Sequence, residues 1–125
     1  MKTYLYTLCI LSLLSINNAF GQDYESTLKN QDFATLEALL TNDVTIKVAN
    51  EDKVKGKAEG IKVLREAISV FNPTSAKSRH NGNSVNAESD YVIVNLENAN
   101  GESMRVFVHL ENSSNGKRIC DIKIR

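Results

Sequence analysis

Residues 91–110 read YVIVNLENANGESMRVFVHL, and this stretch decides the fold. Apolar and polar side chains alternate on both sides of Asn100-Gly101, a period of two that is typical of half-buried β-strands. Tight hairpin turns favour this dipeptide because Asn and Gly tolerate positive φ angles. The stretch therefore predicts two antiparallel strands, over residues 88–98 and 102–112, joined by a turn.

Further strands extend this hairpin on both sides. Asn115-Gly116 is a second turn signal, and an alternating run over residues 117–125 follows it. Residues 74–86 supply a strand before the hairpin, although their polar middle and Gly82 predict a bulge or bend. The second half of the chain is therefore expected to form an antiparallel meander.

The clearest helix precedes the meander, over residues 56–71. Its apolar side chains recur at helical spacing on one face, and they are Ile61, Leu64, Ile68 and Phe71. Asn72-Pro73 ends the helix, because a proline disfavours the helical conformation of the residue before it. This stripe predicts that one side of the helix packs against the sheet.

Shorter elements precede this helix. Two short helices are expected over residues 23–30 and 32–40, with Asp32 as the N-cap of the second. An alternating strand over residues 44–48 and a short return strand at residues 54–55 follow them. All elements together predict an α+β fold in which amphipathic helices pack on an antiparallel sheet.

Residues 1–21 have the pattern of a cleaved secretory signal peptide. Lys2 supplies the positive end, residues 4–14 form an apolar run, and residues 19–21 place small side chains where a signal peptidase cuts. The run is shorter than the stretch of about 20 apolar residues that spans a bilayer. We therefore expect a periplasmic or secreted protein with one domain over residues 22–125, and no membrane attachment after cleavage.

Composition narrows the classes of function. The chain has 15 basic and 15 acidic residues, and they are interspersed. Nucleic-acid-binding proteins normally gather a basic surplus on one face, so neither a nucleic acid nor another electrostatic partner is implied. Only Cys120 remains after signal cleavage, so no intramolecular disulfide forms. We interpret Cys120 as a buried small apolar residue, with a reactive thiol or an intermolecular disulfide as the alternative.

The order of helices, strands, helix and meander resembles the nuclear transport factor 2-like superfamily, a cone-shaped α+β fold shared with ketosteroid isomerases and scytalone dehydratase. Residues 29–36 through 42–44 resemble its opening, a helix pair followed by an acidic residue that starts the first strand. More narrowly, the chain is similar to a family of small exported proteins of unknown function from Gram-negative bacteria. The matching segments are residues 80–82, 91–93, 100–101, 105–107 and 121–124. This resemblance implies a curved, cone-like sheet and supplies no catalytic signature.

Strand parity divides the predicted sheet into two faces. One face is almost wholly apolar, and it carries Val92, Val94, Leu96, Met104, Val106, Val108, Leu110, Cys120, Ile122 and Ile124. The enzymes of the superfamily have their pocket on this covered side, where the chemistry needs a carboxylate or histidine base and oxyanion donors. The pattern offers only the Cys120 thiol there, so we expect a filled core. The alternative is a cavity for a small apolar ligand.

The opposite face is mixed in character. Its centre holds Tyr91, Ile93, Phe107 and His109, and charged residues surround them. An apolar centre with a charged rim is typical of protein interfaces. Because many superfamily members dimerise through the outer sheet face, the resemblance implies a homodimer that uses these residues. The alternative is a solvated face with a few exposed apolar groups.

His80 and Arg105 are the candidates for a ligand or anion contact, because a basic pair near a cleft can hold an anion. No spacing of His, Cys or carboxylate residues resembles a metal site. The sequence also has no phosphate-binding glycine loop and no nucleophile elbow. No catalytic residue, metal or cofactor is therefore predicted.

These observations favour a small exported binding or protein-interaction module, as a monomer or homodimer, over an enzyme. The second hypothesis is a lyase, isomerase or hydrolase that acts on a small apolar substrate between sheet and helices. The third is an immunity or inhibitor protein whose outer sheet face docks a partner.

Overall fold

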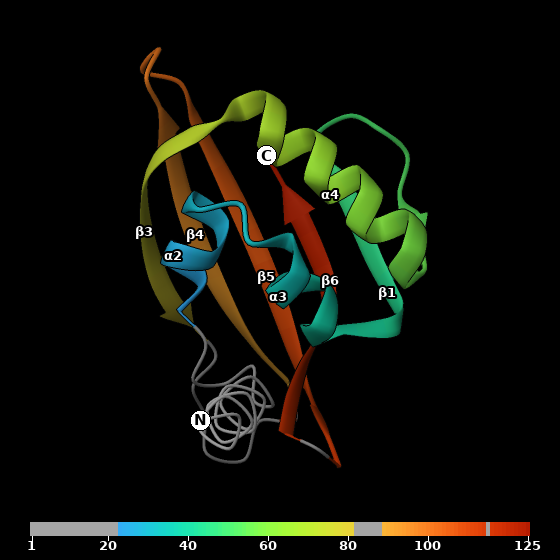
Figure 1. Cartoon of the computed structure of the whole chain (residues 1–125). Coiled ribbons are helices and arrows are strands. Elements are labelled where there is room, and N and C mark those ends of the chain that lie inside the picture. Colours follow the sequence, from blue (N-terminus) through green and yellow to red (C-terminus); the bar gives the residue numbers. More distant parts are fainter. Residues whose placement is uncertain (1–22, 82–88, 115) are drawn as a thin grey trace, which may run out of the picture.

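The computed structural model describes residues 23–81, 89–114 and 116–125. Over these residues, three helices pack on one face of a curved, six-stranded sheet (Figure 1). The helices are α2 (Tyr24–Lys29), α3 (Phe33–Leu39) and α4 (Lys57–Phe71). The strands are β1 (Leu40–Val48), β2 (Val54–Lys55), β3 (Pro73–Asn81), β4 (Ser89–Asn98), β5 (Ser103–Ser113) and β6 (Gly116–Ile124). The predicted α+β class is confirmed.

The strand order of the sheet is β2-β1-β6-β5-β4-β3. The predicted meander is present, because β3, β4, β5 and β6 pair in sequence order and antiparallel. β1 pairs with β2 antiparallel but lies parallel to β6, so the sheet is mixed. This parallel pair joins the first part of the chain to the end of the meander and places β6 inside the sheet.

α4 packs on the sheet through its predicted apolar stripe. Ile61, Leu64 and Ile68 are buried. Full burial of such an aliphatic side chain stabilises a protein by roughly 1.5–3 kcal/mol relative to exposure. The helix ends at Asn72, which is left-handed with φ 55°, directly before Pro73. The predicted helix and its end are confirmed.

The start of β1 differs from the expectation. The side chain of Asp32 accepts a hydrogen bond from the Thr35 N–H at 3.3 Å, so the predicted N-cap of α3 is confirmed. However, α3 ends at Leu39 and β1 begins at Leu40, four residues before the expected strand at 44–48. The β1–β6 register shifts between Leu40 and Thr45. Because of this irregularity, the first residues of β1 do not show the alternation of apolar and polar side chains by which a strand is recognised.

The helices cover the inner face of the sheet, which forms the core. The buried inner-face residues of the meander include Val92, Val94, Leu96, Val106, Val108, Leu110, Ile122 and Ile124, as predicted. The prediction that Cys120 is buried on the inner face is wrong. The register shifts after His109, so Leu110 pairs with Ile119, which is fully buried, while Cys120 is half-buried. This β-bulge inserts one extra residue into β6 and reverses the alternation.

β3 lies at one edge of the sheet, and α2 protects part of that edge. The Glu25 carboxylate accepts hydrogen bonds from the Ser78 N–H at 2.6 Å and from the Ser78 hydroxyl at 3.1 Å. Unpaired N–H groups of an edge strand invite pairing with another chain. Glu25 therefore occupies a donor that a second strand would otherwise use.

Two predicted features fall outside the described residues. They are the signal peptide over residues 1–21 and the bend at Gly82. Among the described helices, none combines the length and the apolar character that crossing a bilayer requires.

Candidate functional site

The outer face of the sheet, opposite the helices, brings the four residues of the predicted dimer face together. Tyr91 pairs with His109 and Ile93 pairs with Phe107, on the neighbouring strands β4 and β5. Tyr91 is 41% exposed, whereas the other three side chains are half-buried. We call these four residues the central cluster. Whether it forms a dimer interface stays a prediction.

Two rows of cross-strand neighbours run over this face, and they are rich in basic side chains. The first row contains Arg79, Ile93, Phe107, Lys123 and Lys47, from β3 to β1. The second contains Lys77, Asn95, Arg105 and Arg125. Directly opposite residues on adjacent strands point to the same face. We call these two sets the basic rows.

The basic rows hold no acidic residue, although the whole chain has a formal net charge of zero. The nearest carboxylates in the register belong to Asp121 and Glu97, in the rows on either side. Asp121 accepts a hydrogen bond from the Thr45 hydroxyl. The fold therefore concentrates positive charge that is dispersed along the sequence, and the expectation of no electrostatic partner loses its basis.

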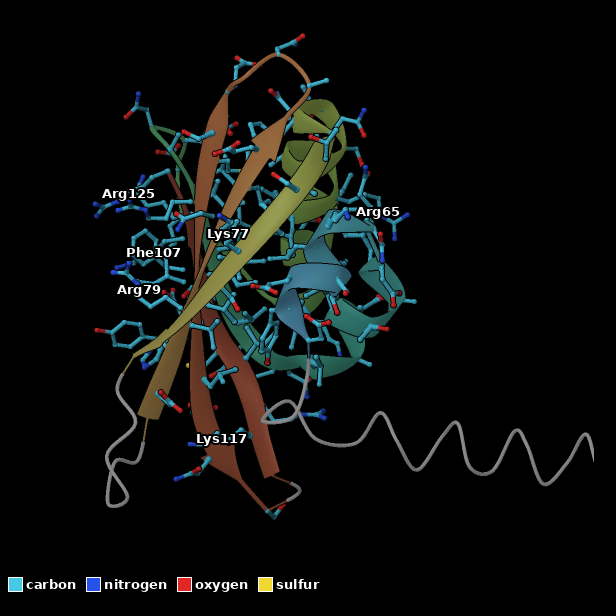
Figure 2. All side chains as sticks on the ribbon, turned by 90° about the vertical axis from the view of Figure 1, so that its left-hand side faces the viewer. Arg65, Lys77, Arg79, Phe107, Lys117 and Arg125 are labelled. Atoms are coloured by element: carbon cyan, nitrogen blue, oxygen red, sulfur yellow. The ribbon has the colours of Figure 1, made fainter. Side chains whose placement is uncertain are left out.

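Contacts within the rows hold the guanidinium groups against the sheet. The Arg125 guanidinium lies over the Phe107 ring, 5.5 Å from its centroid. The Arg105 Nε–H donates to the Asn95 side-chain oxygen at 3.2 Å. Figure 2 shows Arg125, Phe107 and Arg79 on the side of the sheet away from the helices. Cation–π stacking leaves the N–H edge of an arginine open to an anion.

A surface cavity of about 330 Å³ lies at one end of the basic rows. Its lining residues are Asn95, Ser103, Met104, Arg105 and Arg125. Two guanidinium groups, an amide and a hydroxyl are suitable partners for a carboxylate or phosphate oxygen. The predicted anion contact at Arg105 thus has a second arginine, Arg125, beside it. Strand parity places Arg125 on this face of the sheet, because it shares the parity of Lys123.

The predicted pairing of His80 with Arg105 has a different outcome. His80 lies opposite Val92 and Arg105 lies opposite Asn95, so three positions of β4 separate their cross-strand partners. The side chain of His80 is outside the described part of the structure. A joint anion contact of these two residues therefore stays a prediction.

The inner face carries one carboxylate that the sequence analysis missed. Asp90 lies opposite Leu110 at the start of β4 and is 4% exposed. Its carboxylate accepts a hydrogen bond from the Tyr91 N–H at 2.8 Å. The statement that only the Cys120 thiol is available on this face is therefore wrong. Asp90 was predictable, because it lies two residues before Val92 in the same strand and therefore faces the same side of the sheet.

Across the described residues, no group of three or more His, Cys, Asp or Glu could hold a metal ion.

Cys120 is expected to react slowly with iodoacetamide at about pH 8. Burial, followed by the negative charges of Glu111 and Asp121, raises the pKa of this thiol from its ordinary 9.0 to about 11. Only the thiolate is nucleophilic, so the alkylation rate should keep rising up to about pH 11. The alkylation rate of Cys120 is measured by mass spectrometry, as the alkylated fraction over time at each pH, with the urea-unfolded chain as control. A folded-state rate that levels off near pH 9 would contradict the raised pKa.

The fold places the chain in the nuclear transport factor 2-like class. A solved protein of this class and of unknown function, from Silicibacter pomeroyi, is 14% identical with a TM-score of 0.57, covering 100% of this chain and 98% of that chain. The model of the family described as "Domain of unknown function (DUF4783)" matches residues 22–125, and the chain belongs to this family.

Two solved family members are similar to it. The protein from Bacteroides uniformis is 22% identical with a TM-score of 0.69, covering 81% of this chain and 91% of that chain. The protein from Bacteroides ovatus is 22% identical with a TM-score of 0.67, covering 79% and 87%. No curated protein matches the chain. At these identities the similar structures establish the fold and carry no function.

Proposed function

We propose that this chain is a small exported binding module that contacts its partner through the outer face of the sheet. The observation that carries this proposal is the concentration of cations in the basic rows around Ile93 and Phe107. Export is supported by the signal-peptide pattern of residues 1–21 and by a family match that begins at residue 22.

The inner face supports a binding module less well than the outer face does. Its central side chains are aliphatic and almost fully buried, and they form one cluster with the helices. Acid–base catalysis needs a titratable group within reach of a bound substrate. The enzyme hypothesis, a lyase or isomerase for a small apolar substrate, depends on Asp90 at the end of this face. We keep it as the second candidate because of this one carboxylate.

A second copy of the chain is a poor fit to the outer face. In an isologous dimer each surface meets itself, so the basic rows of two copies would face each other. Like charges held in direct opposition destabilise a pairing. The predicted homodimer uses the same central cluster, and we propose instead that the isolated protein is a monomer and that its partner carries negative charge.

Native mass spectrometry of the protein recovered after export is expected to show a monomer without residues 1–21 and without a bound small molecule. This result follows from the signal pattern, the like charges of the outer face and the packed inner face. A co-purifying small molecule would favour the enzyme hypothesis instead. A dimer would restore the homodimer prediction if the substitution Phe107→Glu abolished it.

A further inference from the structure

We infer that the partner of the basic rows is an acidic protein surface, an inference that rests on the proposed function. The first row has Arg79 at one end, Lys123 and Lys47 at the other, and Ile93 with Phe107 between them. A complementary surface therefore presents carboxylates around an apolar group. Protein interfaces combine an apolar core with a polar rim in this way, and their hot spots are rich in Tyr and Arg.

The size of the face predicts how strong such a complex is. Adjacent strands lie about 4.8 Å apart, so the row from Lys47 to Arg79 extends over about 19 Å. The two rows are two residues apart along each strand, about 7 Å, so with the width of the side chains the patch measures about 19 Å by about 14 Å. Its area of about 270 Å² is about a third of the roughly 800 Å² that each partner of a standard interface buries. We therefore expect a weak complex whose affinity depends strongly on salt.

The same surface fits other polyanions less well. Single-stranded nucleic acids stack their bases on the faces of aromatic rings. Here Arg125 lies over one face of the half-buried Phe107 ring, so Tyr91 is the exposed aromatic side chain of the central cluster. A membrane would require exposed apolar side chains to insert. Among the described residues, the exposed large hydrophobic side chains are Tyr91 and Val70, and Val70 lies on α4. A sulfated polysaccharide presents sulfate and hydroxyl groups, so it would leave the apolar pair of Ile93 and Phe107 without an apolar partner.

The cavity at the end of the rows suits one carboxylate of the partner. Arg105 on β5 and Arg125, directly after β6, line it, and Ser103 adds a hydroxyl donor. Guanidinium groups bind carboxylates through two parallel N–H···O bonds. The cavity thereby gives a preferred position to one acidic side chain within a surface that otherwise attracts by charge.

The test is fluorescence anisotropy with a labelled acidic peptide that has a Phe-Leu pair at its centre. We expect the double variant Arg79→Glu, Arg105→Glu to bind this peptide at least about tenfold more weakly than the unchanged protein, because it reverses charge in both rows. Raising the salt from about 0.01 M to about 0.1 M shortens the Debye length from about 30 Å to about 10 Å and should weaken binding too.

The matched control is the double variant Lys29→Glu, Lys62→Glu. Both side chains are exposed on helices at the other side of the sheet, and the net charge changes by the same amount. At about 0.1 M salt, where the Debye length is about 10 Å, we expect its affinity for the peptide to change by less than about twofold, since surface charges farther away than a Debye length are screened. Circular dichroism of each variant shows whether it has kept its fold.

Three further probes separate the inference from the proposed function. They are a peptide of equal charge with Ser in place of Phe-Leu, a single-stranded DNA, and phosphatidylglycerol vesicles. The inference fails, and the binding module stands, if DNA or vesicles bind more tightly than the Phe-Leu peptide and the outer-face variant loses that binding. It also fails if both peptides bind equally. If the outer-face and control variants bind every probe alike, the proposed function fails as well.

Discussion

Replacing Leu64 with alanine is expected to lower the free energy of unfolding by about 2–5 kcal/mol, the range typical of buried leucines. Leu64 is fully buried in the stripe of α4 that faces the sheet. Truncation removes apolar contacts and leaves a cavity, and both effects destabilise the folded state. Urea unfolding followed by circular dichroism gives the difference in free energy.

The same helix offers the control for this prediction. Val70 is 82% exposed, so Val70→Ala should change the free energy of unfolding by less than about 0.5 kcal/mol. The comparison also bears on function, because a side chain that lines an open ligand cavity loses few packed contacts on truncation. A cost of less than about 1 kcal/mol for Leu64→Ala would contradict the packed core and favour the enzyme hypothesis.

Local patterns predicted most of the fold correctly. The period of two across Asn100-Gly101 identified β4 and β5, and the stripe of α4 identified which sheet face the helix covers. These signals are local, since side-chain direction follows from the repeat of the element itself. The parallel pairing of β1 with β6 has no local signal, because it joins segments more than 70 residues apart, such as Thr45 and Asp121.

Strand alternation assigned side chains to the wrong face of the sheet where a bulge added one residue to a strand. Because of the bulge in β6, Ile119 is buried on the inner face where Cys120 was expected. No residue type at these positions predicts a bulge. Asp90 was missed for a different reason, since the alternating pattern was followed only over its apolar members. Counting two residues back from Val92 would have placed a carboxylate on the inner face.

The basic rows could be identified only from the pairing of the strands. Lys47, Lys77 and Arg105 come from three separate strands, and Lys47 and Arg105 have acidic residues within four positions in the sequence. Net charge is a property of composition, whereas a charged face is a property of pairing. A balanced composition therefore does not exclude a charged face, and the expectation of no electrostatic partner stays untested. Strand parity places both Arg105 and Arg125 on the outer face, and the β5–β6 pairing shows that they lie side by side. An anion contact at Arg105 stays a prediction.

Replacing Gly60 with valine is expected to lower the free energy of unfolding by about 1–3 kcal/mol, the usual cost of overpacking a core. A Cβ atom at Gly60 would lie 3.0 Å from Ile46 Cδ1 and 3.5 Å from Val44 Cγ1. Val44 and Ile46 are fully buried on β1, so neither can turn toward solvent. The branched side chain would therefore force α4 away from β1. Thermal or urea unfolding measures the loss.

Two controls separate crowding from helix propensity. Ala58 is exposed on the same helix, so Ala58→Val measures the intrinsic cost of a valine, about 0.5 kcal/mol. The double variant Gly60→Ala, Ile46→Val adds one carbon and removes the Cδ1 atom that it would meet. Alanine is also a better helix former than glycine by about 1 kcal/mol. We therefore expect the double variant to be at least as stable as the unchanged protein, while Ile46→Val alone costs about 0.5–1.5 kcal/mol. Additive effects of the two single substitutions would show that α4 and β1 do not meet at this atom.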